Sequence, residues 1–435
     1  MDSVVQPNAA GTGAWPAAPR AEIVAVGSEM LTPSKTDTNS LYITEVLNEL
    51  GIEVSAKMIV GDRIEDLMAL VRLVLARVDL LVMTGGLGPT EDDLTRDAVA
   101  RVVDKPLVEH PAIVETIRAR FERRGMVMPE INRRQAMVPE GATVIDNPNG
   151  TAPGLWIPYG NRIIILLPGP PREMRAMLRK LADGPLAARV GRERLFRRVI
   201  GIAGRGESHV EQALLPCYAR WKTWELPIDA TILAAMGQVE LHLTVRTADE
   251  AHGQSVLERA VADVRETIGI DVFSDRGESL EQVIGRLLTE RGLTVAAAES
   301  CTGGLLTSRL TDIPGSSTYV ERSVVAYSNQ AKIDLLGVPR ELIAEHGAVS
   351  EPVATAMADG VRQRAGVDLG IAITGIAGPG GGTQTKPVGT VAIALAGPGD
   401  ARRVRTFTFI GGRLQVKFQA SQSALDMIRR TLQRT

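Results

Sequence analysis

The residues with the clearest chemical potential lie in the last third of the chain, in the segment AESCTGG at 298–304. A short apolar run at 293–298 precedes a serine and two glycines, where a helix is expected to begin. N–H groups exposed at the start of a helix can bind a phosphate or a developing oxyanion. Ser300 can act as a nucleophile if another group removes its proton. Taken alone, the turn favours a simpler role, in which Ser300 or Thr302 caps the helix.

A glycine-rich loop supports a catalytic interpretation. Its sequence is TGIAGPGGGT at 374–383, and six of these ten residues are Gly or Pro. It follows an expected buried strand at 369–374, so its backbone could approach a ligand closely. The loop lacks the Gly-Lys-Ser/Thr ending of a P-loop, so hydrolysis of nucleoside triphosphates is not indicated.

Two residues could activate Ser300. A Ser-His-acid triad would have to use His346, the one histidine of this part of the chain. A Ser-Lys pair would use Lys332, in the segment YSNQAK at 327–332, if burial depressed the lysine pKa. Tyr327 could relay or orient the proton. A solvated lysine on a helix is the simpler interpretation of Lys332.

Cys301 is a rival nucleophile, because a thiolate attacks more readily than a hydroxyl. No neighbouring cation is evident in the sequence to lower its pKa, although the start of a helix could do so. We interpret Cys301 as a small buried residue that packs behind the turn.

A second constellation, GGLGPTEDDLT at 85–95, follows an expected strand at 79–84. Thr90 and Asp93 form a pair similar to a capping box, which places three acids in the first turn of a helix. This does not explain the preceding glycines. Because acids repel phosphate unless a cation bridges them, Asp92 and Asp93 suggest a divalent metal held between carboxylates and a pyrophosphate. Loops at 27–29, 37–40, 149–154 and 168–173 are expected at the same rim.

The elements that position these residues alternate between strands and helices. In the first part they are expected at 21–27, 39–50, 52–60, 64–77, 79–84 and 162–167. This order predicts a doubly wound sheet with ligands at the carboxyl ends of its strands. A small α+β module follows, with strands at 195–203 and 239–246 and helices from 207 and over 250–268. The last part has expected strands at 293–298, 320–327, 369–374, 389–396 and 404–409 and helices at 279–291, 302–311, 329–336, 352–365 and 414–433.

The predicted fold class is therefore multidomain α/β. A chain of 435 residues is too long for one hydrophobic core. We expect a disordered leader at 1–20, a doubly wound domain at 21–180, the small module at 190–275 and an α/β domain at 277–435. The module carries no catalytic constellation, and we interpret it as a scaffold for a homodimer.

Composition excludes several classes of protein. A net charge of -2 and an aromatic content of 3% argue against direct binding of nucleic acid. Two widely separated cysteines predict neither a disulfide framework nor a metal site, and favour a reducing cytoplasm. No apolar run approaches the roughly 20 residues that a membrane span needs.

Four motifs of the last domain occur in the order found in the CinA C-terminal domain, which the region 277–435 resembles. They are AESCTGG at 298–304, YSNQAK at 327–332, HGAVS at 346–350 and TGIAGPGG at 374–381. The family includes nicotinamide-nucleotide amidases, which convert nicotinamide mononucleotide to nicotinate mononucleotide and ammonia without a cofactor. The resemblance implies that Ser300 is the nucleophile, Lys332 its base and Tyr327 an assisting group. It implies substrate contacts from Cys301, Thr302, Gly303, Thr374, Gly375, Gly378 and Arg413.

One departure concerns the segment before the last helix. The family's Gly-Asp-Arg appears here as Gly411-Gly412-Arg413. Arg413 is retained and suits a substrate phosphate. The change of Asp to Gly removes a group that could orient Arg413.

The first domain, over about 21–180, resembles the molybdopterin-binding fold of full-length CinA proteins. Some members of that group hydrolyse ADP-ribose with a divalent cation such as Mg²⁺, whereas related domains bind pterin. The resemblance implies a site formed by Glu29, Asn39, Gly85, Gly86, Gly88, Thr90, Asp92, Asp93 and Gly169, with Asp92 and Asp93 as metal ligands. This chain reads GSEMLTP at 27–33, where relatives more often have Gly-Thr-Glu-Leu-Leu and a glycine-containing loop.

These resemblances predict a cytoplasmic enzyme of pyridine-nucleotide salvage that acts on nicotinamide mononucleotide and, through its first domain, on ADP-ribose. The alternatives are an accessory protein of competence or DNA damage, and a pterin-nucleotide-binding module without pyrophosphatase activity. Metal-dependent turnover of ADP-ribose by the first domain would distinguish the pyrophosphatase from the binding module.

Overall fold

The computed structural model describes Trp15 and residues 18–398 and 402–433. The chain divides into two compact units. The first comprises residues up to Phe196 together with Arg246–Gly253, and the second comprises Arg197–Val245 and the chain from Gln254 onward. The predicted multidomain α/β class is confirmed.

The first unit is built on a six-stranded sheet with the order β2-β1-β3-β8-β7-β6. The first four strands in this order are parallel, and the last two run antiparallel to their neighbours. The strands are β1 (Arg20–Val26), β2 (Glu53–Val60), β3 (Leu80–Thr84), β6 (Thr143–Ile145), β7 (Gly154–Tyr159) and β8 (Arg162–Leu167), and β4 (Leu107–Glu109) and β5 (Met137–Pro139) form a separate pair.

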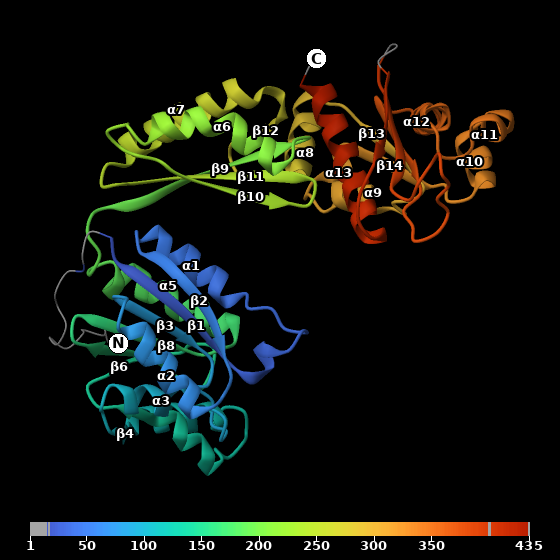
Figure 1. Cartoon of the computed structure of the whole chain (residues 1–435). Helices are drawn as coiled ribbons and strands as arrows, with labels where there is room; N and C mark the ends of the chain where they lie inside the picture. Colours follow the sequence, from blue (N-terminus) through green and yellow to red (C-terminus); the bar gives the residue numbers. More distant parts are fainter. Residues whose placement is uncertain (1–14, 16–17, 399–401, 434–435) are drawn as a thin grey trace. The chain divides into compact units, whose positions relative to one another are not determined.

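Helices cover both faces of this sheet, as a doubly wound fold requires (Figure 1). Successive strand residues alternate between the two cores: Ile23 and Val82 pack with one set of helices, whereas Val24 and Leu81 pack with the other. One face is covered by α1 (Asn39–Glu49) and α5 (Pro171–Leu181), and the other by α2 (Ile64–Leu75), α3 (Thr95–Val102) and α4 (Pro111–Glu122). Shorter turns are η1 (Ser28–Leu31), η2 (Glu130–Ala136) and η3 (Ala182–Leu186).

A four-stranded sheet of order β10-β11-β9-β12 lies mainly in the second unit, although the first residues of β9 and the last of β11 count with the first unit. The elements of this region are β9 (Arg194–Ala203), α6 (Glu207–Trp221), β10 (Asp229–Ala235), β11 (Gln238–Thr247), α7 (Glu250–Ile268), η4 (Gly269–Asp271) and β12 (Val272–Ser274). The sequence did not predict β10. This edge strand is exposed at nearly every position, so it lacks the alternation of buried and exposed residues that identifies β11.

The second unit continues into a five-stranded sheet of order β14-β13-β15-β16-β17. The strands β13 (Val295–Glu299), β14 (Val320–Val325) and β15 (Leu369–Gly375) are parallel, whereas β16 (Thr390–Ala396) and β17 (Arg402–Thr408) run antiparallel to their neighbours. The helices are α8 (Leu280–Arg291), α9 (Leu305–Thr311), α10 (Asn329–Leu336), α11 (Arg340–His346), α12 (Glu351–Ala365) and α13 (Arg413–Leu432), with η5 (Ser316–Thr318) between α9 and β14.

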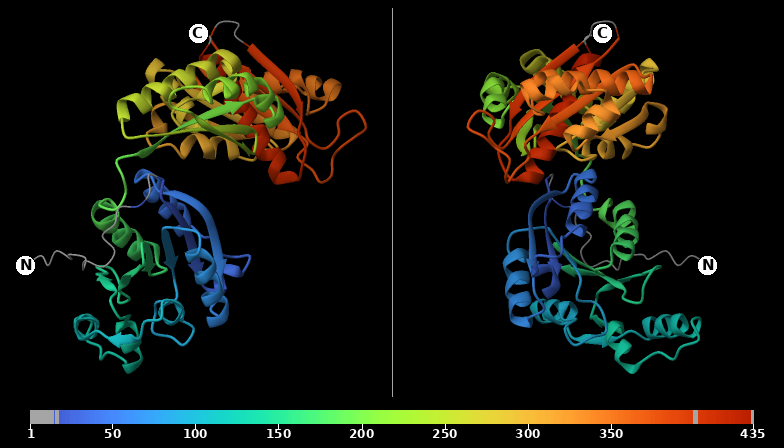
Figure 2. Two further views of the ribbon diagram at one scale, coloured as in Figure 1. Left: turned by 60° about the vertical axis from the view of Figure 1, so that its left-hand side comes forward. Right: turned by 90° about the vertical axis from the view of Figure 1, so that its right-hand side faces the viewer.

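Helices pack on both faces of this sheet (Figure 2), and the two faces differ in the size of the residues they bury. Large aliphatic residues such as Ile371 and Ile393 pack against α8, α9 and α13. The opposite face presents small side chains to α10, α11 and α12, namely Ala296, Ala298, Ala372, Ala392, Ala394 and Ala396. Small residues let α12 approach the sheet closely: a Cβ on Gly370 would lie 2.3 Å from the carbonyl oxygen of Ala358.

None of the helices within the described ranges combines the length and apolar character needed to cross a membrane.

Candidate functional site

The Ser300 turn is anchored at the carboxyl ends of three neighbouring strands. Ser300 directly follows β13, which lies between β14 and β15. The backbone N–H of Ser300 donates to the carbonyl of Ile373 at 2.9 Å, and that of Ala326 donates to the carbonyl of Glu299 at 2.8 Å. The chain therefore holds Ser300 at the edge where ligands bind in parallel α/β sheets.

The side chain of Glu299, rather than that of Ser300 or Thr302, accepts hydrogen bonds from the backbone N–H groups at the start of the following helix. This side chain is fully buried and accepts from the N–H groups of Gly304, Leu306 and Thr307 at 2.9–3.1 Å, and from the Thr307 hydroxyl at 2.6 Å. The helix α9 begins at Leu305, three residues later than expected. The capping interpretation of Ser300 and Thr302 is therefore wrong, and the Ser300 hydroxyl is available for another role.

Lys332 is the hydrogen-bond partner of the Ser300 hydroxyl. It lies on α10, which is capped by the side chain of Ser328, and it is only 1% exposed. Its Nζ donates to Ser300 Oγ at 3.0 Å and to the carbonyl of Ala326 at 2.9 Å. Burial lowers the pKa of Lys332, because desolvation penalises the ammonium form. The interpretation of Lys332 as a solvated lysine is wrong.

His346 makes different contacts. It ends α11, where its ring lies 3.7 Å from a carboxylate oxygen of Glu345. Its backbone carbonyl accepts from Lys386 Nζ at 2.8 Å. The contacts of the Ser300 hydroxyl therefore favour a Ser-Lys pair over the triad that would use His346.

Cys301 is buried, as expected. A Cβ on Gly375 would lie 3.0 Å from Cys301 Sγ, so the thiol packs against the glycine of the neighbouring strand. Burial raises the pKa of Cys301 to about 11, an effect that exceeds the opposing influence of Lys332. At neutral pH the thiolate is thus a minor species, which argues against Cys301 as the nucleophile.

Thr302 carries an unsatisfied polar atom beside the nucleophile. Its side chain is fully buried, and its Oγ1 has no hydrogen-bond partner among the described residues. A buried hydroxyl without a hydrogen-bond partner lowers the stability of the folded state by about 1–3 kcal/mol. A bound ligand that forms a hydrogen bond with Oγ1 would account for it. Gly303, next in the turn, has a φ of +62°, which favours glycine.

Arg413 connects the glycine-rich loop to the segment before α10. Its two terminal nitrogens donate to the Gly378 carbonyl at 2.8 Å and to the Tyr327 hydroxyl at 2.6 Å. These contacts orient the guanidinium where the family's Asp is replaced by Gly412. The Tyr327 hydroxyl is thus engaged by Arg413. Thr374 Oγ1 donates to the Ala348 carbonyl at 2.8 Å, fixing the start of the loop.

The residues predicted for the first domain line a separate crevice of about 560 Å³ in the first unit. All of them border it except Thr90: Glu29, Asn39, Gly85, Gly86, Gly88, Asp92, Asp93 and Gly169. The crevice also includes Asp62 and Gln135, which are not among the residues predicted from the sequence. Asp62 comes two residues after β2, so the rule that strand ends line ligand sites could have found it. Gln135 lies in a 3₁₀ turn and gives no such signal.

The acids after the glycines do not form the first turn of a helix. The helix α3 begins at Thr95, and residues 90–94 form turns. Asp93 accepts from the N–H groups of Gly88 and Thr90 at 2.7 and 2.8 Å and from the Thr90 hydroxyl at 2.5 Å. The prediction of acids within the helix is therefore wrong. Asp93 instead fixes the shape of the loop.

The predicted metal site was Asp92 and Asp93. Across the described ranges, no three or more His, Cys, Asp or Glu side chains are placed to hold a metal ion. The carboxylate of Asp93 already accepts three hydrogen bonds. These residues do not fit a cation held by the protein alone.

The chain resembles known proteins over both parts. Residues 277–432 match the family described as the CinA C-terminal domain, and residues 22–188 match the probable molybdopterin binding domain. A CinA-like protein of Koribacter versatilis is 46% identical, with 95% of this chain and 99% of the relative covered. A putative competence-damage inducible protein of Symbiobacterium thermophilum is 45% identical, with 95% and 98% covered. The crystal structure of the competence/damage inducible protein CihA from Agrobacterium tumefaciens is 41% identical, covers 35% of this chain and 93% of its own, and has a TM-score of 0.35.

Proposed function

The chain belongs to the CinA family, and on that premise we propose that its C-terminal part is an amidase acting on nicotinamide mononucleotide. The products are nicotinate mononucleotide and ammonia. The observation that carries the proposal is the buried contact of 3.0 Å between Lys332 Nζ and Ser300 Oγ. A lysine with a pKa lowered by burial is suited to remove a proton from a serine.

The reaction proceeds in two halves. Neutral Lys332 takes the proton of the Ser300 hydroxyl as Oγ attacks the carboxamide carbon, which gives a tetrahedral oxyanion. The C–N bond then breaks, and the Lys332 ammonium protonates the departing nitrogen, which leaves as ammonia. A water molecule attacks the resulting ester while Lys332 accepts one of its protons. Cleavage of the ester releases the carboxylate and returns the proton to Ser300 Oγ.

Arg413 suits the substrate phosphate. A guanidinium has five N–H donors, and two nitrogens of Arg413 each use one donor on Gly378 and Tyr327. The remaining donors can bind phosphate oxygens. The Oγ1 of Thr302, which has no hydrogen-bond partner among the described residues, can form a hydrogen bond with the carboxamide of the substrate. These two contacts would place the amide carbon next to Ser300 and the phosphate away from it.

Ammonia release from nicotinamide mononucleotide tests the proposal. We expect turnover by the purified chain and a loss of at least 1000-fold in kcat for Ser300→Ala and for Lys332→Met, since nucleophile and base act as a unit. Lys386→Met, which changes another lysine that binds a backbone carbonyl, is the matched control. Absence of turnover by folded wild-type protein, or full activity of Lys332→Met, would contradict the proposal.

For the first unit we propose binding of a nucleotide with a pyrophosphate group, with hydrolysis of ADP-ribose as the candidate reaction. The crevice is lined by glycine backbone, and the buried Oδ1 of Asn39 lacks a hydrogen-bond partner among the described residues. Among the described residues, the lining of the crevice includes six carboxylates and no Lys, Arg or His. These carboxylates would repel free pyrophosphate, so we expect binding only when the ligand brings its own divalent cation. Calorimetry with ADP-ribose in Mg²⁺ and in EDTA checks this: equal binding in both would contradict it.

A further inference from the structure

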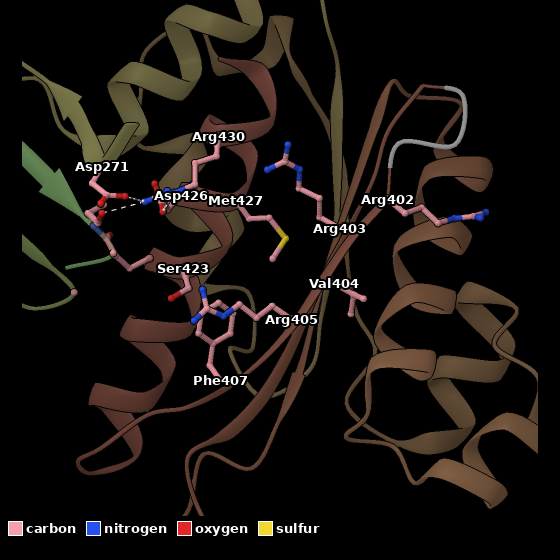
Figure 3. A pocket seen from close by; sticks show the side chains of 14 residues that line it. Asp271, Arg402, Arg403, Val404, Arg405, Phe407, Ser423, Asp426, Met427 and Arg430 are labelled. Carbon is pink, nitrogen blue, oxygen red and sulfur yellow. Dashed lines mark hydrogen bonds and ion pairs between the residues drawn. The ribbon is translucent and has the colours of Figure 1, made fainter. Parts of the chain in front are cut away.

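A large cavity of the second unit lies between the helix α13 and the edge strand β17 (Figure 3). Its volume is about 800 Å³. None of Ser300, Lys332, Thr374 and Arg413 lines it, so it is separate from the amidase site. The amidase proposal does not account for this cavity.

One wall of the cavity carries a shared network of charges. Asp271 is bound by Arg430 at 2.6 Å and by Arg205, and Asp426 is bound by Arg430 at 2.6 Å and by Arg429 at 2.9 Å. Burial opposes the ionisation of Asp271, but its hydrogen bonds with Arg430 and Arg205 outweigh it and lower its pKa. Three arginines thus share two carboxylates, which leaves one positive charge in excess.

The opposite wall is the strand β17, which supplies further arginines. Arg402 is paired with Asp359 at 3.2 Å, whereas Arg405 lies over the ring of Phe407 at 4.7 Å and has no carboxylate partner among the described residues. The Arg405 and Arg403 side chains extend into the space that Ser423 and Met427 border from α13 (Figure 3). The cavity is therefore positively charged in a chain whose net charge is -2.

We propose that this cavity binds a nucleoside diphosphate. Arginines on two facing walls suit a group with several phosphate oxygens. The Arg405 guanidinium can donate two parallel hydrogen bonds. Arg430 uses Nε and Nη2 on Asp426, Asp271 and the Ala203 carbonyl, and its Nη1 can donate to a further phosphate oxygen. The volume falls within the range of about 300–1,000 Å³ that holds small-molecule ligands, so the site has room for a nucleoside beyond the phosphates. The Met427 side chain offers apolar contacts for that nucleoside, as does the part of the Phe407 ring that Arg405 and Phe409 leave uncovered.

Calorimetric titration of the full chain with ADP tests the proposal. The buffer contains EDTA to remove divalent cations. Without such a cation, the carboxylates that line the crevice of the first unit repel phosphate, so ADP should not bind there. We expect Arg405→Gln to weaken ADP binding at least tenfold, or about 1.4 kcal/mol. Arg322→Gln, on the edge strand at the other end of the same sheet, is the matched control and should bind as the wild type does. Pyrophosphate should bind more weakly than ADP, and adenosine should not bind measurably.

The same titration separates this cavity from the amidase site. Arg413→Gln removes the expected phosphate anchor of the amidase and should leave ADP binding unchanged. Loss of binding in Arg413→Gln but not in Arg405→Gln would assign the ligand to the amidase site and overturn the proposal. Unchanged binding in Arg405→Gln, or no binding by the wild type, would also overturn it. So would Arg405-dependent binding of a single-stranded oligonucleotide that is tighter than that of ADP.

Discussion

Replacing Lys332 with methionine should change how the stability of the C-terminal domain depends on pH. Methionine keeps most of the volume of the lysine stem and removes the amine. The variant loses the hydrogen bonds to Ser300 and Ala326, which costs stability at every pH. The substitution also removes a buried amine whose pKa is lowered by desolvation, and the contribution of that amine to stability varies with pH.

The sign follows from proton binding. Between the lowered pKa of folded Lys332 and about 10.5 in the unfolded chain, the unfolded lysine holds a proton that the folded lysine lacks. The stability of the wild type therefore rises with pH in this window, by up to about 1.4 kcal/mol per pH unit. The variant has no such contribution. Its stability relative to the wild type should therefore fall as the pH rises toward 10.5.

Scanning calorimetry of both proteins between pH 7 and 10 measures this difference. For a domain of 150–250 residues, about 1.4 kcal/mol corresponds to roughly 3–5 °C in Tm. We expect the difference in Tm between the variant and the wild type to move against the variant by up to that amount per pH unit. Lys386→Met controls for the loss of a lysine from the same domain. A difference that stays constant over this range would mean that folded Lys332 keeps its proton, which would refute its role as a neutral base.

Three further substitutions test other parts of the site. Glu299→Gln should destabilise the domain by about 3 kcal/mol or more in calorimetry, because an amide nitrogen replaces an oxygen that accepts two hydrogen bonds. The matched control Glu321→Gln changes an exposed glutamate and should leave the stability unchanged. Gly375→Ala should cost about 1–3 kcal/mol and lower activity, because its Cβ would lie 2.6 Å from Val391 and 3.0 Å from Cys301 Sγ; wild-type stability would contradict the packing described for this glycine. Cys301→Ala should keep at least a tenth of the ammonia release, because the pKa of its thiol is raised to about 11, and a loss as large as that of Ser300→Ala would make Cys301 the nucleophile.

The alternation of strands and helices was readable from the sequence, because buried strands such as β3 and β15 are continuous apolar runs. The glycines after them marked both candidate sites. The sequence offers both His346 and Lys332 as the base for Ser300, and the resemblance to CinA favours Lys332. Spacing alone could not supply the pairing of Lys332 with Ser300, since the two residues are 32 positions apart and meet only through the parallel pairing of β13 and β14.

The role of Glu299 could not be predicted from local patterns. A carboxylate at the end of a buried strand gives no periodic signal, and its partners lie five to eight residues later, beyond the reach of a capping box. The sequence predicts too early a start for α3 for a related reason. Asp93 binds back to Thr90 and Gly88, and this local pattern is shared by a helix cap and a closed loop.

Trapping the acyl-enzyme with hydroxylamine tests the central claim most directly. If Ser300 attacks the carboxamide of nicotinamide mononucleotide, hydroxylamine will compete with water for the ester and yield the hydroxamate of nicotinate mononucleotide. Mass spectrometry should detect this product with the wild type and with Cys301→Ala, and not with Ser300→Ala. Ammonia release by the wild type without any hydroxamate, or hydroxamate formation by Ser300→Ala, would contradict the account.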